Sequence, residues 1–174
     1  VALVVGGANA DDSRLLGFAG LAALEIAKLG GKIIIGDIDD EAGERSVKRM
    51  KEAGLTADYM HLDVTSESDW ITAVEAATSM YGHLDILIMA AGAGDRDTSI
   101  EDTPVDAWRK VMDVTNLGMF LGTRSVVGAM RESGGGSIVL ISSMMAKVVR
   151  ESANAYATSR AGMTHFARSA AVQY

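Results

Sequence analysis

The sequence predicts an α/β fold, with a doubly wound parallel sheet in a three-layer αβα arrangement. Short runs rich in Val, Ile and Leu alternate with amphipathic stretches from end to end. The runs are continuously apolar, as expected for strands buried on both faces. The alternation of five strands with five helices implies right-handed crossovers, and the doubly wound rule then predicts the strand order 3-2-1-4-5.

The individual elements follow from these runs and from their boundary residues. Strands are predicted at Ala2–Val5, Lys32–Gly36, Tyr59–Leu62, Leu84–Met89 and Ser137–Ile141. Helices are predicted at Gly17–Leu29, Asp40–Ala53, Ser66–Tyr81, Pro104–Glu132 and Tyr156–Gln173. Ser66 or Ser68 suits the cap of the third helix, and Thr103 before Pro104 suits the start of the fourth. No boundary or repeat interrupts the pattern, so residues 1–174 are expected to form one domain.

Composition excludes several classes of function. The 174 residues are 48% hydrophobic and carry a net charge of −7, which argues against nucleic acid or an anionic membrane as partner. No apolar run reaches the roughly 18 residues that a membrane span needs. The chain has no cysteine, and its three histidines lack metal-ligand spacing, so neither disulfides nor a metal site is expected. A cytoplasmic location fits. Because Tyr174 ends a helical pattern without a cap, we expect further sequence beyond it.

Glycines after the first predicted strand suit a dinucleotide. Gly6 and Gly7 follow the strand, and Gly17 and Phe18 open the next helix, so backbone amides can approach a pyrophosphate at the positive helix end. The intervening stretch is long, however, and Ala10–Leu16 contains two aspartates, whose charges oppose a pyrophosphate. An ordinary glycine-rich loop therefore stays open as the alternative.

Asp37 and Ile38 follow the second predicted strand, where a carboxylate accepts hydrogen bonds from the adenosine ribose hydroxyls. An acid at this position repels a 2′-phosphate, which favours NAD over NADP. The alternative is a turn or capping aspartate, a role that Asp39 suits better than Asp37.

Small and acidic residues also follow the third and fourth predicted strands. Asp63, followed by Val64, either contacts the adenine amino group or forms a turn. Ala90, Ala91 and Gly92 leave room for a cofactor against the strand ends. Because the carboxyl ends of parallel strands share one edge of the sheet, where open α/β sheets bind ligands, these segments are expected to act together.

Ser143, Tyr156 and Arg160 form the most informative triplet. Ser143 stands 13 residues before Tyr156, and Arg160 stands four after it. A serine and a tyrosine can hold one substrate oxygen, while a fixed positive charge favours tyrosinate over tyrosine. Free tyrosine titrates at about 10, so it is a poor base at neutral pH without such a neighbour. The alternatives are a turn cap for Ser143, a helix start for Tyr156, and a surface ion pair with Glu151 for Arg160.

Together these residues resemble the short-chain dehydrogenase/reductase family over essentially the whole chain. The matching segments are the glycine turn, Gly36–Asp39, Leu62–Val64, Leu84–Leu87, Ile138–Ser143 and Tyr156–Gly162. The resemblance implies a Rossmann-type fold, NAD as cofactor, and catalytic roles for Ser143, Tyr156 and Arg160. It also implies a homodimer or homotetramer. Two further strands and a substrate-covering segment would then lie beyond Tyr174.

The chain departs from the family pattern in four places. Arg160 replaces the family's lysine, and arginine cannot release a proton at working pH. Met89–Gly92 replaces the usual Asn-Asn-Ala-Gly, and the glycine loop is longer than usual. Thr115 stands where the family has an asparagine three residues before a glycine, and Asn116 is its neighbour. A shift of one residue turns a helical side chain by about 100°.

The predicted function is NAD-dependent interconversion of a secondary alcohol and a ketone. Tyr156 would exchange a proton with the substrate oxygen, Ser143 would hydrogen-bond that oxygen, and Arg160 would also hold the nicotinamide ribose. Neighbouring apolar residues predict a fairly apolar substrate; they are Met144, Met145, Val148 and Val149.

Two alternatives stay open. The Ser-Tyr-Arg triad also resembles the halohydrin dehalogenases, relatives that lost the nicotinamide cofactor, and Phe18-Ala19-Gly20 resembles their halide loop. The other alternative is a catalytically weak NAD-binding protein. Asp37 and Asp63 favour a working NAD site over the dehalogenase.

Overall fold

The computed structural model describes residues 1–8, 17–94 and 99–174. Its parallel sheet has the order β3-β2-β1-β4-β5, as the sequence predicts. The strands are β1 (Ala2–Val5), β2 (Ile33–Asp37), β3 (Ala57–His61), β4 (Ile86–Met89) and β5 (Ser137–Leu140). The α-helices are α1 (Phe18–Lys28), α2 (Asp40–Glu52), α3 (Glu67–Tyr81), α4 (Val105–Met112), α5 (Gly118–Glu132) and α6 (Asn154–Gln173).

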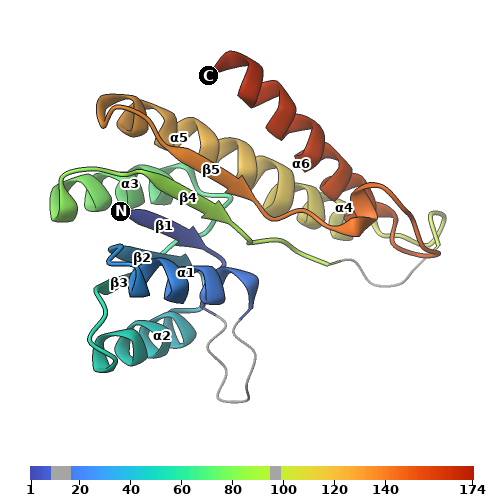
Figure 1. Cartoon of the computed structure of the whole chain (residues 1–174). Helices are drawn as coiled ribbons and strands as arrows, with labels where there is room; N and C mark the ends of the chain where they lie inside the picture. The colour runs from blue at the N-terminus through green and yellow to red at the C-terminus, as the bar shows by residue number, and fades with distance from the viewer. Residues whose placement is uncertain (9–16, 95–98) are drawn as a thin grey trace.

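Helices cover both faces of this sheet (Figure 1). Helices α1 and α2 pack on one face against alternate residues of the central strands, such as Val4 and Ile35. Helices α3 and α5 pack on the other face, where Trp70 is fully buried beside Leu3 and Val5. Successive strand residues thus serve two separate cores, which explains why the strands are continuously apolar.

Two predicted helix caps are confirmed, and a third helix start differs from the prediction. The Asp39 carboxylate accepts the Ala42 N–H at the start of α2, and the Ser66 hydroxyl accepts the Asp69 N–H at the start of α3. Pro104 is the N-cap residue of α4 rather than its first helical residue. The hydroxyl of the preceding Thr103 donates to the Ser99 carbonyl at 2.7 Å.

The long helix predicted from Pro104 to Glu132 is wrong in its middle. A π-helical turn, η1 (Asp113–Leu117), separates α4 from α5. This turn packs against α6, where the Asn116 amide donates to the Ser159 carbonyl at 3.1 Å. A π turn shifts the helical register, and such turns are frequent at functional sites.

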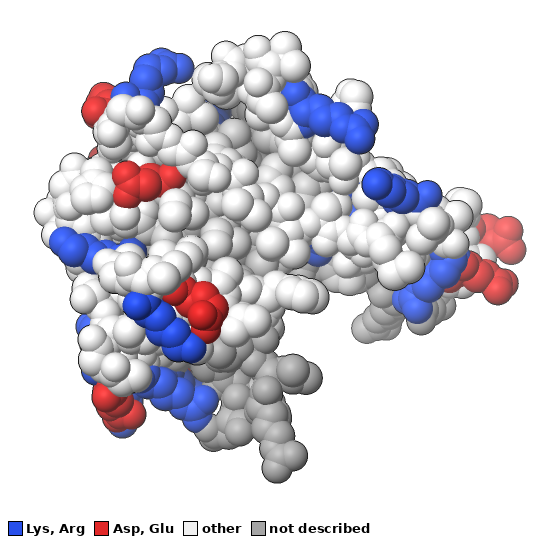
Figure 2. Space-filling view, viewed as in Figure 1, with Lys and Arg blue, Asp and Glu red and all other residues white. Residues whose placement is uncertain are grey.

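Strand β5 forms one edge of the sheet, and Val139 at its centre is 42% exposed. A groove of about 700 Å³ lies beside it, between α5, β5 and α6. Most of the groove's larger side chains are apolar, including Met130, Ile138 and Phe166. The face seen in Figure 2 carries few charges near its centre, and both positive and negative side chains lie around its margins.

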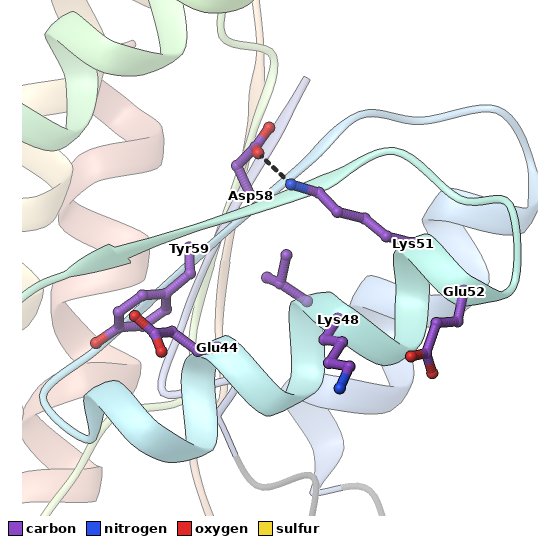
Figure 3. Close-up of a pocket in the computed structure, with 7 residues that line it drawn as sticks. Glu44, Lys48, Lys51, Glu52, Asp58 and Tyr59 are labelled. Atoms are coloured by element: carbon purple, nitrogen blue, oxygen red, sulfur yellow. Dashed lines mark hydrogen bonds and ion pairs between the residues drawn. The ribbon is translucent and has the colours of Figure 1, made fainter.

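A second, shallower depression lies between α2 and β3 (Figure 3). Charged side chains of α2 surround it, and Lys51 pairs with Asp58 of β3 at 2.8 Å. Asp58 belongs to the amino-terminal half of its strand, so this depression is not at the edge where the strands end. Within the part of the chain that the structure describes, no helix is long and apolar enough to cross a membrane.

Candidate active site

The carboxyl ends of all five strands meet at one edge of the sheet, because the strands are parallel (Figure 1). The turns that follow them carry several of the candidate site residues, while Tyr156 and Arg160 lie on α6. Ligands of open α/β sheets bind at this edge. The stretch Ala10–Leu16 lies outside the described residues.

The glycine turn after β1 lies close to the end of β4. Gly6 has a φ of +78°, and a Cβ on it would lie 2.5 Å from the Ala91 nitrogen, so no other residue fits without displacing the backbone. The N–H groups of Ala90 and Ala91 both donate to the Val5 carbonyl. The small residues after β4 therefore form one wall of the glycine turn. Gly7 is the next residue of that turn.

Helix α1 begins at Phe18, and its N-cap residue, Gly17, offers no side chain to the first N–H groups. The positive end of α1 therefore has no side-chain cap from Gly17. Phe18 is 81% exposed, whereas Ala19 and Gly20 are buried in the first turn of α1. These three residues are helical, so the segment likened to a halide loop is not a loop here.

Asp37, the last residue of β2, is bonded to the glycine turn after β1. One carboxylate oxygen accepts the Ala8 N–H at 3.0 Å, and the other accepts the Asp39 N–H at 3.2 Å. Both bonds hold the carboxylate against the backbone at the edge of the sheet. Each oxygen keeps acceptor capacity for a hydroxyl. Ile38, the next residue, is exposed.

The segment after β3 serves mainly as a turn. The Asp63 carboxylate accepts both the N–H and the hydroxyl of Thr65, at 2.9 and 2.8 Å. Val64 is buried, and its carbonyl accepts the Trp70 indole N–H at 3.0 Å. These bonds match the turn alternative for Asp63. Both of them use the same carboxylate oxygen.

Tyr156 and Arg160 stack on each other within α6. The guanidinium carbon lies 4.9 Å from the centroid of the Tyr156 ring, a cation–π geometry. Arg160 is only 7% exposed, and its Nη1 donates to the Ile141 carbonyl at the end of β5, at 2.9 Å. The alternative of a surface ion pair with Glu151 therefore does not describe this side chain.

The space around the guanidinium is closely fitted. A Cβ on Gly92 would lie 2.2 Å from Arg160 Nη2, so the glycine after β4 makes room for the larger cation. Arg160 Nε is buried and has no hydrogen-bond partner among the described residues. The sequence reasoning did not connect these two positions; the relevant signal was that arginine needs more room than the lysine expected there.

Ser143 lies in the connection from β5 to the next short helix. It is the N-cap residue of η2 (Met144–Ala146), and its hydroxyl accepts the Met145 N–H at 3.1 Å. The turn-cap alternative for Ser143 therefore holds, and it leaves the hydroxyl proton available for another acceptor. Helix η2 packs against α6, which carries Tyr156.

Two further side chains join this region to neighbouring helices. The Ser142 hydroxyl lies within hydrogen-bond distance of both the Arg160 carbonyl and the Thr164 hydroxyl, each at 3.0 Å. Asn116 reaches α6 from the π-helical turn. Within the described ranges its Oδ1 has no partner, and neither has the buried hydroxyl of Thr115. Asn116, the neighbour of the position where the family has its asparagine, thus contacts α6, which carries Tyr156 and Arg160.

No group of three or more His, Asp or Glu side chains in residues 1–8, 17–94 and 99–174 is arranged to hold a metal ion. Among the described residues, this edge offers hydroxyls, the buried guanidinium of Arg160 and the Asp37 carboxylate.

The sequence matches known proteins along its whole length. A family model described as short chain dehydrogenase matches residues 1–174. The 3-alpha-(or 20-beta)-hydroxysteroid dehydrogenase of Mycobacterium tuberculosis is 41% identical over 144 residues, which cover 83% of this chain and 51% of that protein. The chain thus spans about half the length of this curated relative.

Solved structures show the same fold. A 7 alpha-hydroxysteroid dehydrogenase complexed with NADH and 7-oxo glycochenodeoxycholic acid has a TM-score of 0.89 at 27% identity, over 99% of this chain and 64% of that one. An actinorhodin polyketide ketoreductase with NADPH has a TM-score of 0.90, also at 27% identity and with the same coverage.

Proposed function

Because the chain belongs to the short-chain dehydrogenase family, we propose that it is the cofactor-binding and catalytic part of an NAD-dependent oxidoreductase. Its substrates would be secondary alcohols and the corresponding ketones. The buried guanidinium of Arg160 stacked on Tyr156, at the edge of the sheet that also carries Asp37, is the observation that supports this proposal most.

The residues at the sheet edge fit a nicotinamide dinucleotide. The Asp37 carboxylate would hold the adenosine ribose, and its charge would oppose the 2′-phosphate of NADP. Gly6 and Gly7 let the backbone approach the pyrophosphate near the start of α1, and Ala90 and Ala91 present no bulky side chains. Solved relatives contain NADH or NADPH, so the choice of NAD here rests on Asp37.

The chemical step divides between cofactor and protein. The nicotinamide ring would accept or supply the hydride. Ser143 would donate a hydrogen bond to the substrate oxygen, and Tyr156 would take the alcohol proton or return it to the carbonyl. Arg160 holds a permanent positive charge against Tyr156, which stabilises the negative charge that the ring carries after losing its proton.

The substrate is proposed to be apolar, as in the hydroxysteroid dehydrogenases. Apolar side chains follow Ser143 directly in the chain, and Met144, Val148 and Val149 are all exposed. Exposed apolar side chains that gather beside a polar site often mark a binding surface. A hydroxysteroid or another cyclic secondary alcohol is therefore the first substrate class to test.

Two measurements test this function. NADH fluorescence is titrated with the chain, and a panel of hydroxysteroids and cyclic alcohols is then assayed for NADH formation, with Tyr156→Phe as the matched control. Binding with turnover that the control lacks is the expected result. Halide release from a bromohydrin without nucleotide would favour the dehalogenase, while NADH binding without any turnover would favour the weak NAD-binding protein.

A further inference from the structure

We propose that Tyr59 is a positioning residue for Asp37, and that its hydroxyl thereby contributes to the preference for NAD over NADP. This inference rests on the proposed NAD site. Tyr59 lies on β3, next to the strand that ends in Asp37, and its side chain contacts the backbone of Asp37 rather than the site itself.

The Tyr59 hydroxyl lies within hydrogen-bond distance of two acceptors. It is 2.8 Å from the Asp37 carbonyl oxygen and 2.5 Å from Oδ1 of Asp40, so one proton is shared between them. The same Asp37 carbonyl also accepts the Leu62 N–H at 2.9 Å. The carbonyl of the ribose-binding residue is therefore held from its neighbouring strand by both a main-chain and a side-chain donor.

The Tyr59 ring is fixed by helix α2, which packs against β3. Figure 3 shows the Tyr59 side chain extending from β3 toward α2. A Cβ on Gly43 of α2 would lie 2.0 Å from the ring, so the ring occupies the space that any larger residue would need. Because the ring cannot shift toward α2, the hydroxyl stays at the Asp37 carbonyl.

Burial and hydrogen bonds keep the Tyr59 hydroxyl protonated, and hydrogen bonds keep the Asp40 carboxylate ionised. Burial and the hydrogen bond to Asp40 raise the pKa of Tyr59, so it remains a donor at any working pH. The Tyr59 hydroxyl and His61, whose Nδ1 lies 2.8 Å from the same carboxylate oxygen, lower the pKa of Asp40. Near neutral pH, the Tyr59 hydroxyl therefore remains the donor and the Asp40 carboxylate remains the acceptor.

Fixing the Asp37 backbone completes the positioning of its carboxylate. The two carboxylate oxygens are already tied to the N–H groups of Ala8 and Asp39, and the Tyr59 hydroxyl adds a bond at the root of the side chain. A carboxylate held at a fixed place both binds the ribose hydroxyls of NAD and opposes a 2′-phosphate. A less firmly held carboxylate would bind the ribose hydroxyls of NAD more weakly, and it would also oppose a 2′-phosphate less.

The Tyr59→Phe variant tests this role, because it removes the hydroxyl and keeps the ring under Gly43. Dissociation constants for NADH and NADPH are measured by fluorescence titration. The Kd for NADH is expected to rise about three- to tenfold, as for the loss of one hydrogen bond, while the Kd for NADPH changes less. Reduced nicotinamide mononucleotide, which lacks the adenosine, should bind the variant as it binds the wild type.

Two further variants distinguish positioning from stability. Tyr81→Phe removes a comparable bond, from a tyrosine hydroxyl to Asp58 of the same strand, and should leave the NADPH-to-NADH Kd ratio unchanged. Gly43→Ala displaces the Tyr59 ring from the helix side and should lower the ratio as Tyr59→Phe does.

An unchanged ratio in Tyr59→Phe and Gly43→Ala, with normal NADH binding by the wild type, would overturn the positioning role alone. If the Tyr59→Phe variant does not fold, an unchanged NADPH-to-NADH Kd ratio in the Gly43→Ala variant would overturn the positioning role. If the wild type binds neither nucleotide, the proposed function fails as well.

Discussion

Gly92→Ala is expected to destabilise the chain, because Arg160 occupies the space that a methyl group at this position needs. The new Cβ would lie 2.2 Å from Nη2 and 3.0 Å from Cζ. The guanidinium has little freedom to retreat, since it is bonded to Ile141 and stacked on Tyr156. Overpacking typically costs about 1–3 kcal/mol, and losing the Ile141 bond would add about 1 kcal/mol. We therefore expect the free energy of unfolding to fall by about 2–4 kcal/mol.

A double-mutant cycle with Arg160→Lys isolates this contact. Lysine lacks the two terminal guanidinium nitrogens, so Gly92→Ala should cost less when it is combined with Arg160→Lys, and the coupling energy should be about 1 kcal/mol or more. Urea unfolding of the wild type, both single variants and the double variant gives the four values. Equal costs of Gly92→Ala in both backgrounds would show that the guanidinium does not occupy this space, and the reasoning would fail.

The remaining predictions concern catalysis, the arginine and acid stability. Tyr156→Phe should lower kcat by about 10²- to 10⁴-fold while the Kd for NADH stays within about threefold, measured by steady-state kinetics and titration. Arg160→Lys should retain or raise oxidoreductase activity, whereas a loss as large as that of Tyr156→Phe would give arginine a dedicated role. Burial raises the pKa of Asp58, but hydrogen bonds from Lys51 and Tyr81 outweigh this effect and hold the pKa below its usual range. This stabilisation is present at neutral pH and lost as the pH falls through that lowered pKa, below about 4, so the Tm of Asp58→Asn should fall less steeply on acidification.

The sheet could be predicted from the sequence because its signals are local and repeated. Uninterrupted apolar runs such as Ile33–Ile35 specify strands buried on both faces, and the crossover rule then fixes their order. Asp39 and Ser66 were also predictable as caps, because each cap needs only one side chain and a nearby N–H.

The π-helical turn at Asp113–Leu117 could not be predicted, because helix periodicity does not encode a local change in register. Asn116 reaches Ser159 only because α6 packs across this turn, and that packing joins segments more than 40 residues apart. A one-residue count from Gly118 therefore could not show that Asn116 contacts α6.

The contact between Tyr156 and Arg160 was predictable from the sequence, but the packing around the guanidinium was not. Spacing identified Tyr156 and Arg160 as partners within one helix, yet the clearance at Gly92 and the bond to Ile141 depend on β4 and β5. In the same way, nothing in the sequence around Asp37 points to Tyr59, since the two residues meet only through strand register.

The uncovered side of β5 has a practical consequence for handling this polypeptide. No described strand pairs with that side, so its main-chain N–H and C=O groups can pair with a strand of another molecule. The exposed side chain of Val139 adds an apolar contact. The 174-residue polypeptide should therefore aggregate as its concentration rises, and light scattering across a dilution series would reveal it. Binding and unfolding experiments belong at the dilute end of that series.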